Sequence, residues 1–106
     1  MKYYTLAELS VTERGWARDY VEQVTPMVER YGGRYLARTN AFEKLEGERE
    51  PAEVVLLIEW PDEEAAGAFY ESEEYRPYRE RRLAGSRGEF LLVAGADVNQ
   101  LARIPE

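Results

Sequence analysis

The side chains best suited to chemistry are polar groups that interrupt otherwise apolar stretches of the chain. Glu8, Arg38 and Glu59 each lie in a segment with the pattern of a β-strand, and Asn40 follows Arg38 at a distance of two residues. Burying an unpaired charge is costly, so such residues are expected to pair or to line a wet cavity. The planar fork of Arg38 fits a carboxylate or an anionic substrate, and a desolvated Glu59 would serve as a proton acceptor.

Two interpretations of these residues remain open. In the first, they line a ligand pocket between the sheet and the sheet of a second copy. In the second, they form a salt bridge that fixes how the two sheets pair, since structural ion-pair networks collect the same residue types. The strand register decides whether Arg38 and Glu59 share a face, and the sequence does not give that register.

Tyrosines are the second group of interest, because the chain has eight of them. Three of the tyrosines are close together in the sequence: Tyr70, Tyr75 and Tyr78. Tyrosines around a cavity suit an aromatic or apolar ligand with one polar group. Ordinary packing in the core or at an interface explains them as well. Tyr75 is the tyrosine that we include among the candidate ligand-binding residues.

A third group is the run of arginines between residues 76 and 87. In an acidic protein such a cluster can receive an anion, but glutamates are interleaved with it, so a solvated helix face with local ion pairs is the favoured interpretation. The arginines are Arg76, Arg79, Arg81, Arg82 and Arg87.

Composition excludes several kinds of chemistry. The 106 residues include no cysteine and no histidine, which removes thiolate chemistry, the usual general base near neutral pH and the commonest metal ligand. The net charge of -7 argues against nucleic acid and anionic membranes as partners. No nucleophile elbow, phosphate loop or dinucleotide motif is present. The sequence therefore predicts neither a metal nor a cofactor.

The elements that must position these residues follow from hydrophobic periodicity and capping signals. Thr12 is expected to cap the first helix, which should kink or split at Pro26. Asp62 and Ser72 are expected to cap two later helices. The predicted order is a strand over 2–11, a helix over 14–31, a strand over 34–45, a turn over 46–53, a strand over 54–60, two helices after Asp62 and Ser72, a loop over 85–88, and a strand over 89–96.

This order predicts an α+β, ferredoxin-like βαββαβ fold, with a four-stranded antiparallel sheet and helices on one face. The chain is long enough for one domain over 1–96, followed by a tail over 97–106. The uncovered face of the sheet would still carry apolar side chains, and two such faces can pack together in a two-fold dimer. Residues expected there are Leu6, Leu36, Phe42, Val55, Leu57, Leu91 and Val93.

The segment Tyr31-Gly32-Gly33-Arg34-Tyr35-Leu36-Ala37-Arg38 resembles the family known as domain of unknown function 1330. Further matching motifs are Leu45-Glu46-Gly47, Ile58-Glu59-Trp60-Pro61, Ala65-Ala66 and Phe69-Tyr70-Glu71-Ser72-Glu73-Glu74-Tyr75. The resemblance covers the chain to about residue 96. It implies a homodimeric α/β barrel, and it supplies no reaction. Trp60 and Glu73 depart from the family pattern, which has phenylalanine and proline there.

Relatives in the wider superfamily include cofactor-free monooxygenases, isomerising enzymes and stress-response proteins. The resemblance therefore implies an uncharacterised protein whose expected role is to bind a small organic ligand in a cavity of the dimeric barrel. The alternatives are a cofactor-independent monooxygenase- or isomerase-like enzyme, and a structural or stress-response homodimer without catalysis. Met1 leads into Lys2 with no apolar signal core, which predicts a soluble, cytoplasmic protein.

Overall fold

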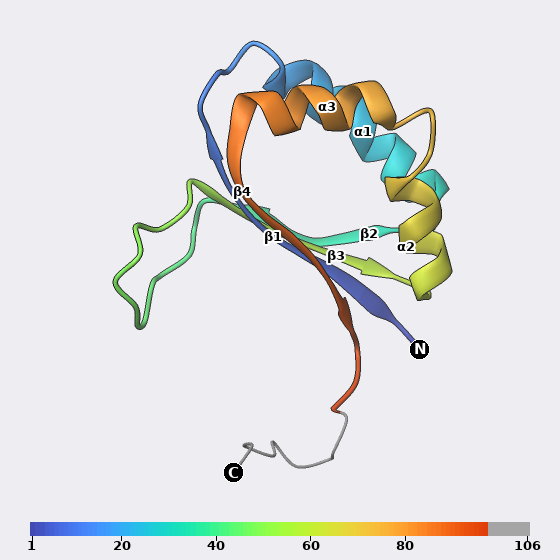
Figure 1. Cartoon of the computed structure of the whole chain (residues 1–106). Helices are drawn as coiled ribbons and strands as arrows, with labels where there is room; N and C mark the ends of the chain where they lie inside the picture. Colours follow the sequence, from blue (N-terminus) through green and yellow to red (C-terminus); the bar gives the residue numbers. More distant parts are fainter. Residues whose placement is uncertain (98–106) are drawn as a thin grey trace.

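The computed structural model describes residues 1–97, and its elements follow the predicted order. Four antiparallel strands form one sheet in the order β2-β3-β1-β4. Three helices lie together on one face of this sheet (Figure 1). The ferredoxin-like arrangement predicted from the sequence is therefore confirmed. The elements are β1 (Tyr3–Val11), α1 (Ala17–Arg30), β2 (Arg34–Thr39), β3 (Val54–Trp60), α2 (Glu63–Tyr70), α3 (Arg76–Gly85) and β4 (Ser86–Ala94).

The core lies between the helices and the sheet. Leu56, Ile58 and Trp60 alternate along β3 and are buried, because every second residue of a strand points to the same face. Val24 and Val28, one turn apart on α1, are buried in the same cluster. The even-numbered residues of β3 therefore mark the face that the helices cover.

The first helix differs from its prediction at its start. It begins at Ala17 after Trp16, which makes no side-chain cap, whereas the backbone N–H of Thr12 donates to the Gly85 carbonyl 2.9 Å away. The helix is not split at Pro26. Pro26 and Glu22 are both exposed, so the carbonyl that loses its partner to the proline faces water.

The strands also differ from the prediction at their ends. The second strand stops at Thr39 rather than at residue 45, and a loop over 40–53 joins it to β3 and extends beyond the sheet (Figure 1). No loop separates α3 from β4, because the helix ends at Gly85 and the strand begins at Ser86. Asp62 caps α2 as expected, its Oδ1 accepting from the Ala65 N–H at 2.8 Å.

The second face of the sheet is open and largely apolar, as the alternation predicted. Leu6, Leu91 and Val93 on this face are 41%, 53% and 40% exposed. Among the described residues, no helix is long and apolar enough to cross a membrane. The predicted tail over 97–106 lies, apart from Asp97, outside the described residues.

Candidate functional site

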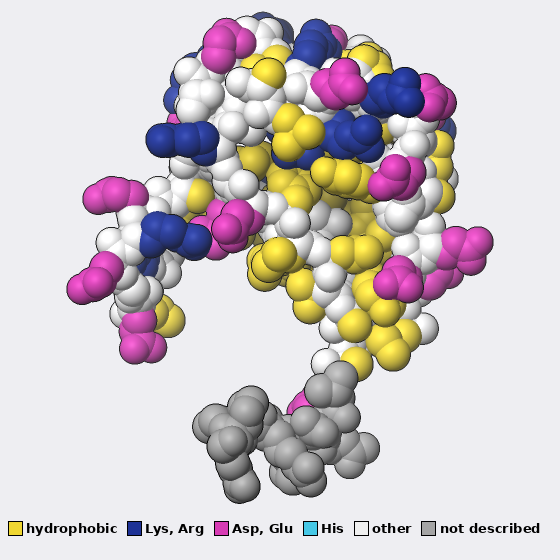
Figure 2. All heavy atoms as spheres, viewed as in Figure 1, with side chains coloured by type: hydrophobic (Ala, Val, Ile, Leu, Met, Phe, Trp, Pro, Cys, Tyr) yellow, Lys and Arg dark blue, Asp and Glu magenta, His cyan; other side chains and the backbone are white. Residues whose placement is uncertain are grey.

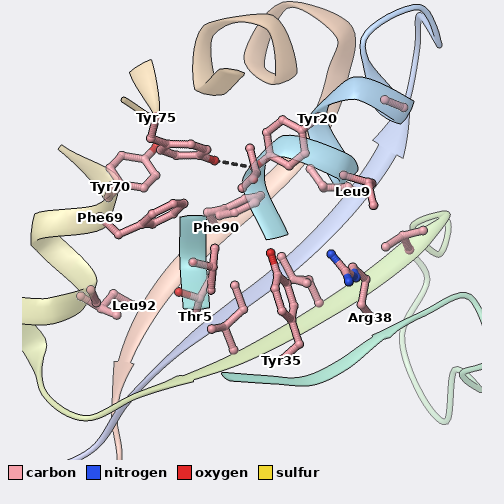
Figure 3. A pocket seen from close by; sticks show the side chains of 18 of the residues that line it. Thr5, Leu9, Tyr20, Tyr35, Arg38, Phe69, Tyr70, Tyr75, Phe90 and Leu92 are labelled. Atoms are coloured by element: carbon pink, nitrogen blue, oxygen red, sulfur yellow. Dashed lines mark hydrogen bonds between the residues drawn. The ribbon is translucent and has the colours of Figure 1, made fainter. Parts of the chain in front are cut away.

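A cavity of about 640 Å³ lies between the sheet and the helices, on the face that the helices cover. Its wall is built from every strand and from α1 and α2, and it is mostly aliphatic and aromatic (Figure 3). Small residues on α2, Ala66 and Gly67, line it, and a Cβ added at Gly67 would meet no atom within 4 Å. A concave, mainly apolar site with a few polar groups is typical of small-molecule binding.

Apolar side chains continue from this region to the surface. Figure 2 shows them gathered below the helical layer, whereas charged side chains lie over the helices and the loop over 40–53. The charged residues on the cavity wall are Arg14, Arg38, Glu53 and Glu71.

Arg38 is on the cavity wall, and a strand irregularity puts it there. The pairing of β2 with β3 shifts register between Tyr35 and Ala37, so Tyr35 and Arg38 both point to the covered face. The Arg38 guanidinium lies 4.0 Å from the centroid of the Tyr35 ring, and its Nη1 donates to Thr25 Oγ1 at 2.8 Å. Burial raises the pKa of the Tyr35 hydroxyl, and the positive charge of Arg38 opposes that rise.

Glu59 lies on the opposite face of the sheet from Arg38. It alternates with Ile58 along β3, and its carboxylate pairs with Lys2 at 3.2 Å and Arg34 at 3.5 Å. Arg38 and Glu59 therefore do not share a face of the sheet. Successive residues of a strand point to opposite faces of the sheet, so Glu59 faces away from its neighbour Ile58. Arg38 is paired with Leu56 rather than with Glu59.

The two remaining polar candidates from the strands also lie away from the cavity. Glu8 is on the open face, where both of its carboxylate oxygens accept from Arg49 at 3.0 Å. Asn40 is exposed at the end of β2 and is not among the residues of the cavity wall. The cavity on the helix side of the sheet therefore includes Arg38 but not Glu8, Glu59 or Asn40.

Tyr75, the fifth candidate, is on the cavity wall. Its side chain is 1% exposed, and its hydroxyl is 2.5 Å from the hydroxyl of Tyr20 on α1 (Figure 3). Burial raises the pKa of Tyr20 far above its usual range, and the neighbouring Tyr75 raises it further. The Tyr20 hydroxyl therefore keeps its proton at neutral pH, and a tyrosine hydroxyl is a hydrogen-bond donor as well as an acceptor.

Arg82 is the residue near this site that sequence reasoning misjudged. It was assigned to a solvated face, yet it is 2% exposed and its Nε lies 3.4 Å from the Tyr75 hydroxyl. The signal was present in the helical spacing, because Arg82 follows Tyr75 by seven residues and Tyr78 by four. Leu83, the next residue of α3, is 57% exposed.

A charged pair lies where the loop over 40–53 meets β1. The Glu53 carboxylate accepts hydrogen bonds from the Arg14 side chain and from the backbone N–H of Val11. Arg14 and Glu53 both line the cavity. The hydrogen bond from Arg14, followed by that from Val11, lowers the pKa of Glu53. This pair closes one end of the cavity wall and supplies no free charge there. Within residues 1–97, no group of three or more acidic side chains is placed to hold a metal ion.

Solved structures share this fold at low sequence identity. A protein of unknown function from Rhodopseudomonas palustris superposes with a TM-score of 0.77 at 17% identity, over 91% of this chain and 83% of that one. A cofactor-independent oxygenase from Streptomyces nogalater gives 0.61 at 16% identity, over 91% and 94%. A dimeric ferredoxin-like protein of unknown function from Jannaschia gives 0.61 at 14%, over 89% and 99%.

These likenesses establish the fold alone, and no curated protein matches the chain in sequence. The sequence does match the family model of the domain of unknown function DUF1330 over residues 2–96. This range contains all of the motifs that carry the resemblance, and it includes each helix and strand of the described residues. The chain is therefore a member of the DUF1330 family, for which no function is established.

Proposed function

We propose that the protein binds a small, largely apolar organic molecule in the cavity between its sheet and its helices. The observation that carries this proposal is the cavity itself, about 640 Å³ of space in a chain of only 106 residues. Well-packed interiors leave few voids larger than a water molecule. A concave, mainly apolar space of this size is in the range of small-molecule sites, which supports a ligand as its occupant.

The polar groups on the wall suit this role. Arg38 at one side and the Tyr20–Tyr75 pair at another offer directional contacts in an otherwise apolar space (Figure 3). Of the five candidates from the sequence, Arg38 and Tyr75 remain in this proposal. Glu8, Glu59 and Asn40 take no part in it, because they lie away from the cavity.

A thermal-shift screen of small aromatic and aliphatic compounds tests the proposal. A ligand that binds only the folded state raises stability by mass action, by about 2.7 kcal/mol at a hundred times its dissociation constant. Gly67→Leu should abolish the shifts, because it places a side chain at the cavity wall. Ala68→Leu is the matched control, since Ala68 is the next residue of α2 and is exposed. Equal shifts in both variants would contradict the proposal. A screen in which no compound stabilises the wild-type protein would also contradict it.

We further propose that the protein works as a homodimer that covers the open sheet face. Support comes from the apolar side chains exposed on that face and from the fold shared with the dimeric protein of Jannaschia. The likeness to the oxygenase is one of fold, so catalysis is not part of this proposal. A binding function requires only the cavity.

A further inference from the structure

The Tyr20–Tyr75 pair and Arg82 form a polar cluster beside the cavity. Tyr20 comes from α1, Tyr75 directly precedes α3, and Arg82 lies two turns further along α3. Both tyrosines line the cavity, whereas Arg82 is buried behind them. The ring of Phe90, also on the cavity wall, lies under the Arg82 guanidinium at 3.9 Å.

The Arg82 Nε–H and the two hydroxyls together have one more proton to donate than the hydrogen bonds among them use. The Arg82 Nε–H donates to the Tyr75 oxygen, and one hydroxyl proton serves the contact between the two tyrosines. Three N–H or O–H groups therefore supply two hydrogen bonds, so one hydroxyl proton is left without an acceptor in the described part of the chain. Because both hydroxyls belong to residues of the cavity wall, a ligand in the cavity is the natural acceptor.

The cluster also carries a positive charge that no carboxylate balances. None of the ion pairs within residues 1–97 includes Arg82, and its Nη2 is buried without a hydrogen-bond partner. Its neighbours are two neutral hydroxyls and the face of Phe90. A buried cation normally requires a partner, since leaving water is costly for a charge.

We propose that the ligand of this cavity is an organic carboxylate, whose anionic oxygen accepts the surplus proton of the Tyr20–Tyr75 pair near the Arg82 cation. The apolar body of the ligand then lies along Phe69 and Phe90, which flank the pair on the wall (Figure 3). This inference rests on the proposed binding function and specifies its ligand class. The net charge of the protein is -7, and the cluster around Arg82 is a site that attracts an anion despite this overall negative charge.

Arg38 is the competing cation, and the surroundings of the two arginines differ. Arg38 is exposed, donates to Thr25 and stacks on Tyr35. Its charge is screened by water, whereas the charge of Arg82 acts through a low-dielectric interior. The cluster around Arg82 is therefore the stronger attraction for an anion.

Two probes of nearly the same shape test this assignment by calorimetry: 2-naphthoate and 2-naphthalenemethanol at neutral pH. The wild-type protein should bind the carboxylate at least about tenfold more tightly, as expected of a hydrogen bond to a charged group. Arg82→Met should remove this preference while the alcohol still binds. Arg82→Lys retains the charge and should retain the preference. Arg38→Gln changes a residue of the cavity wall and is expected to weaken both probes alike, so the ratio of their affinities should be preserved.

The outcomes separate the two proposals. If neither probe binds to the wild-type cavity, the proposed function fails together with the inference for this ligand class. If both bind equally well, the binding function stands and the carboxylate assignment is overturned. Loss of the preference in Arg38→Gln would also overturn it, because the anion would then lie at the other arginine. These wild-type and Arg38→Gln measurements decide the matter even if Arg82→Met does not fold.

Discussion

At the scale of single residues, the contact between Gly85 and Trp16 joins the end of α3 to the start of α1. The Gly85 carbonyl accepts from the Trp16 indole N–H at 3.0 Å and from the backbone N–H groups of Thr12 and Glu13 at 2.9 and 3.1 Å. The indole lies so close that a Cβ at Gly85 would be 2.1 Å from its nitrogen. Glycine is required here because any side chain would collide with the indole.

Replacing this glycine should destabilise the fold. Gly85→Ala forces the Trp16 ring to move, and overpacking of this kind costs about 1–3 kcal/mol. Gly67→Ala is the matched control, because its Cβ would meet no atom within 4 Å and alanine is favoured over glycine in a helix by about 0.5–1 kcal/mol. Urea unfolding of both variants gives the two free energies. A Gly85→Ala variant as stable as Gly67→Ala would contradict this description of the contact.

Sequence reasoning at this scale succeeded where local spacing decides and failed where partners decide. Asp62 caps its helix as predicted, and Tyr75 lies on the cavity wall. Arg82 was misjudged because its charge suggested water, although its spacing from Tyr75 places it on the buried side of α3. Tyr20, whose hydroxyl contacts that of Tyr75 beside Arg82, comes from a distant part of the sequence.

At the scale of elements, the order of strands and helices was predictable from periodicity, whereas the facing of β2 was not. A strict alternation places Tyr35 and Arg38 on opposite sides, but the irregularity between Tyr35 and Ala37 brings them to the same side. Such an irregularity arises from pairing with β3 and leaves no pattern in β2 alone. It is the reason that Arg38 joins the cavity while Glu59, on the opposite face, does not.

At the scale of the whole molecule, one sheet carries a ligand cavity on one face and an apolar surface on the other. The charged side chains on this apolar surface already form ion pairs. Glu59 pairs with Lys2 and Arg34, and Glu8 pairs with Arg49. Exposed apolar side chains between paired charges fit the expectation that the face is covered by a second copy. The two roles of the sheet are therefore separable by mutation.

A charge on the open face should break the proposed dimer. In light scattering, the wild-type protein should have the mass of two chains of 12.3 kDa each. Leu6→Glu, at a site 41% exposed in the middle of β1, should give the mass of one chain. Leu83→Glu is the control, since Leu83 is 57% exposed on α3, away from the sheet face. A wild-type mass of one chain, or a dimer unaffected by Leu6→Glu, would contradict the proposed assembly.

The alternation along β3 offers the most direct test of the central claim, that ligands bind on the helix-covered face. Leu56 and Ile58 line the cavity, whereas their strand neighbours Val55 and Leu57 point to the open face. Methyl NMR spectra recorded during a titration with 2-naphthoate report on both faces at once. The account predicts that the methyl signals of Leu56 and Ile58 shift with saturation while those of Val55 and Leu57 stay in place. Saturable shifts confined to Val55 and Leu57 would place the ligand on the open face and contradict the account.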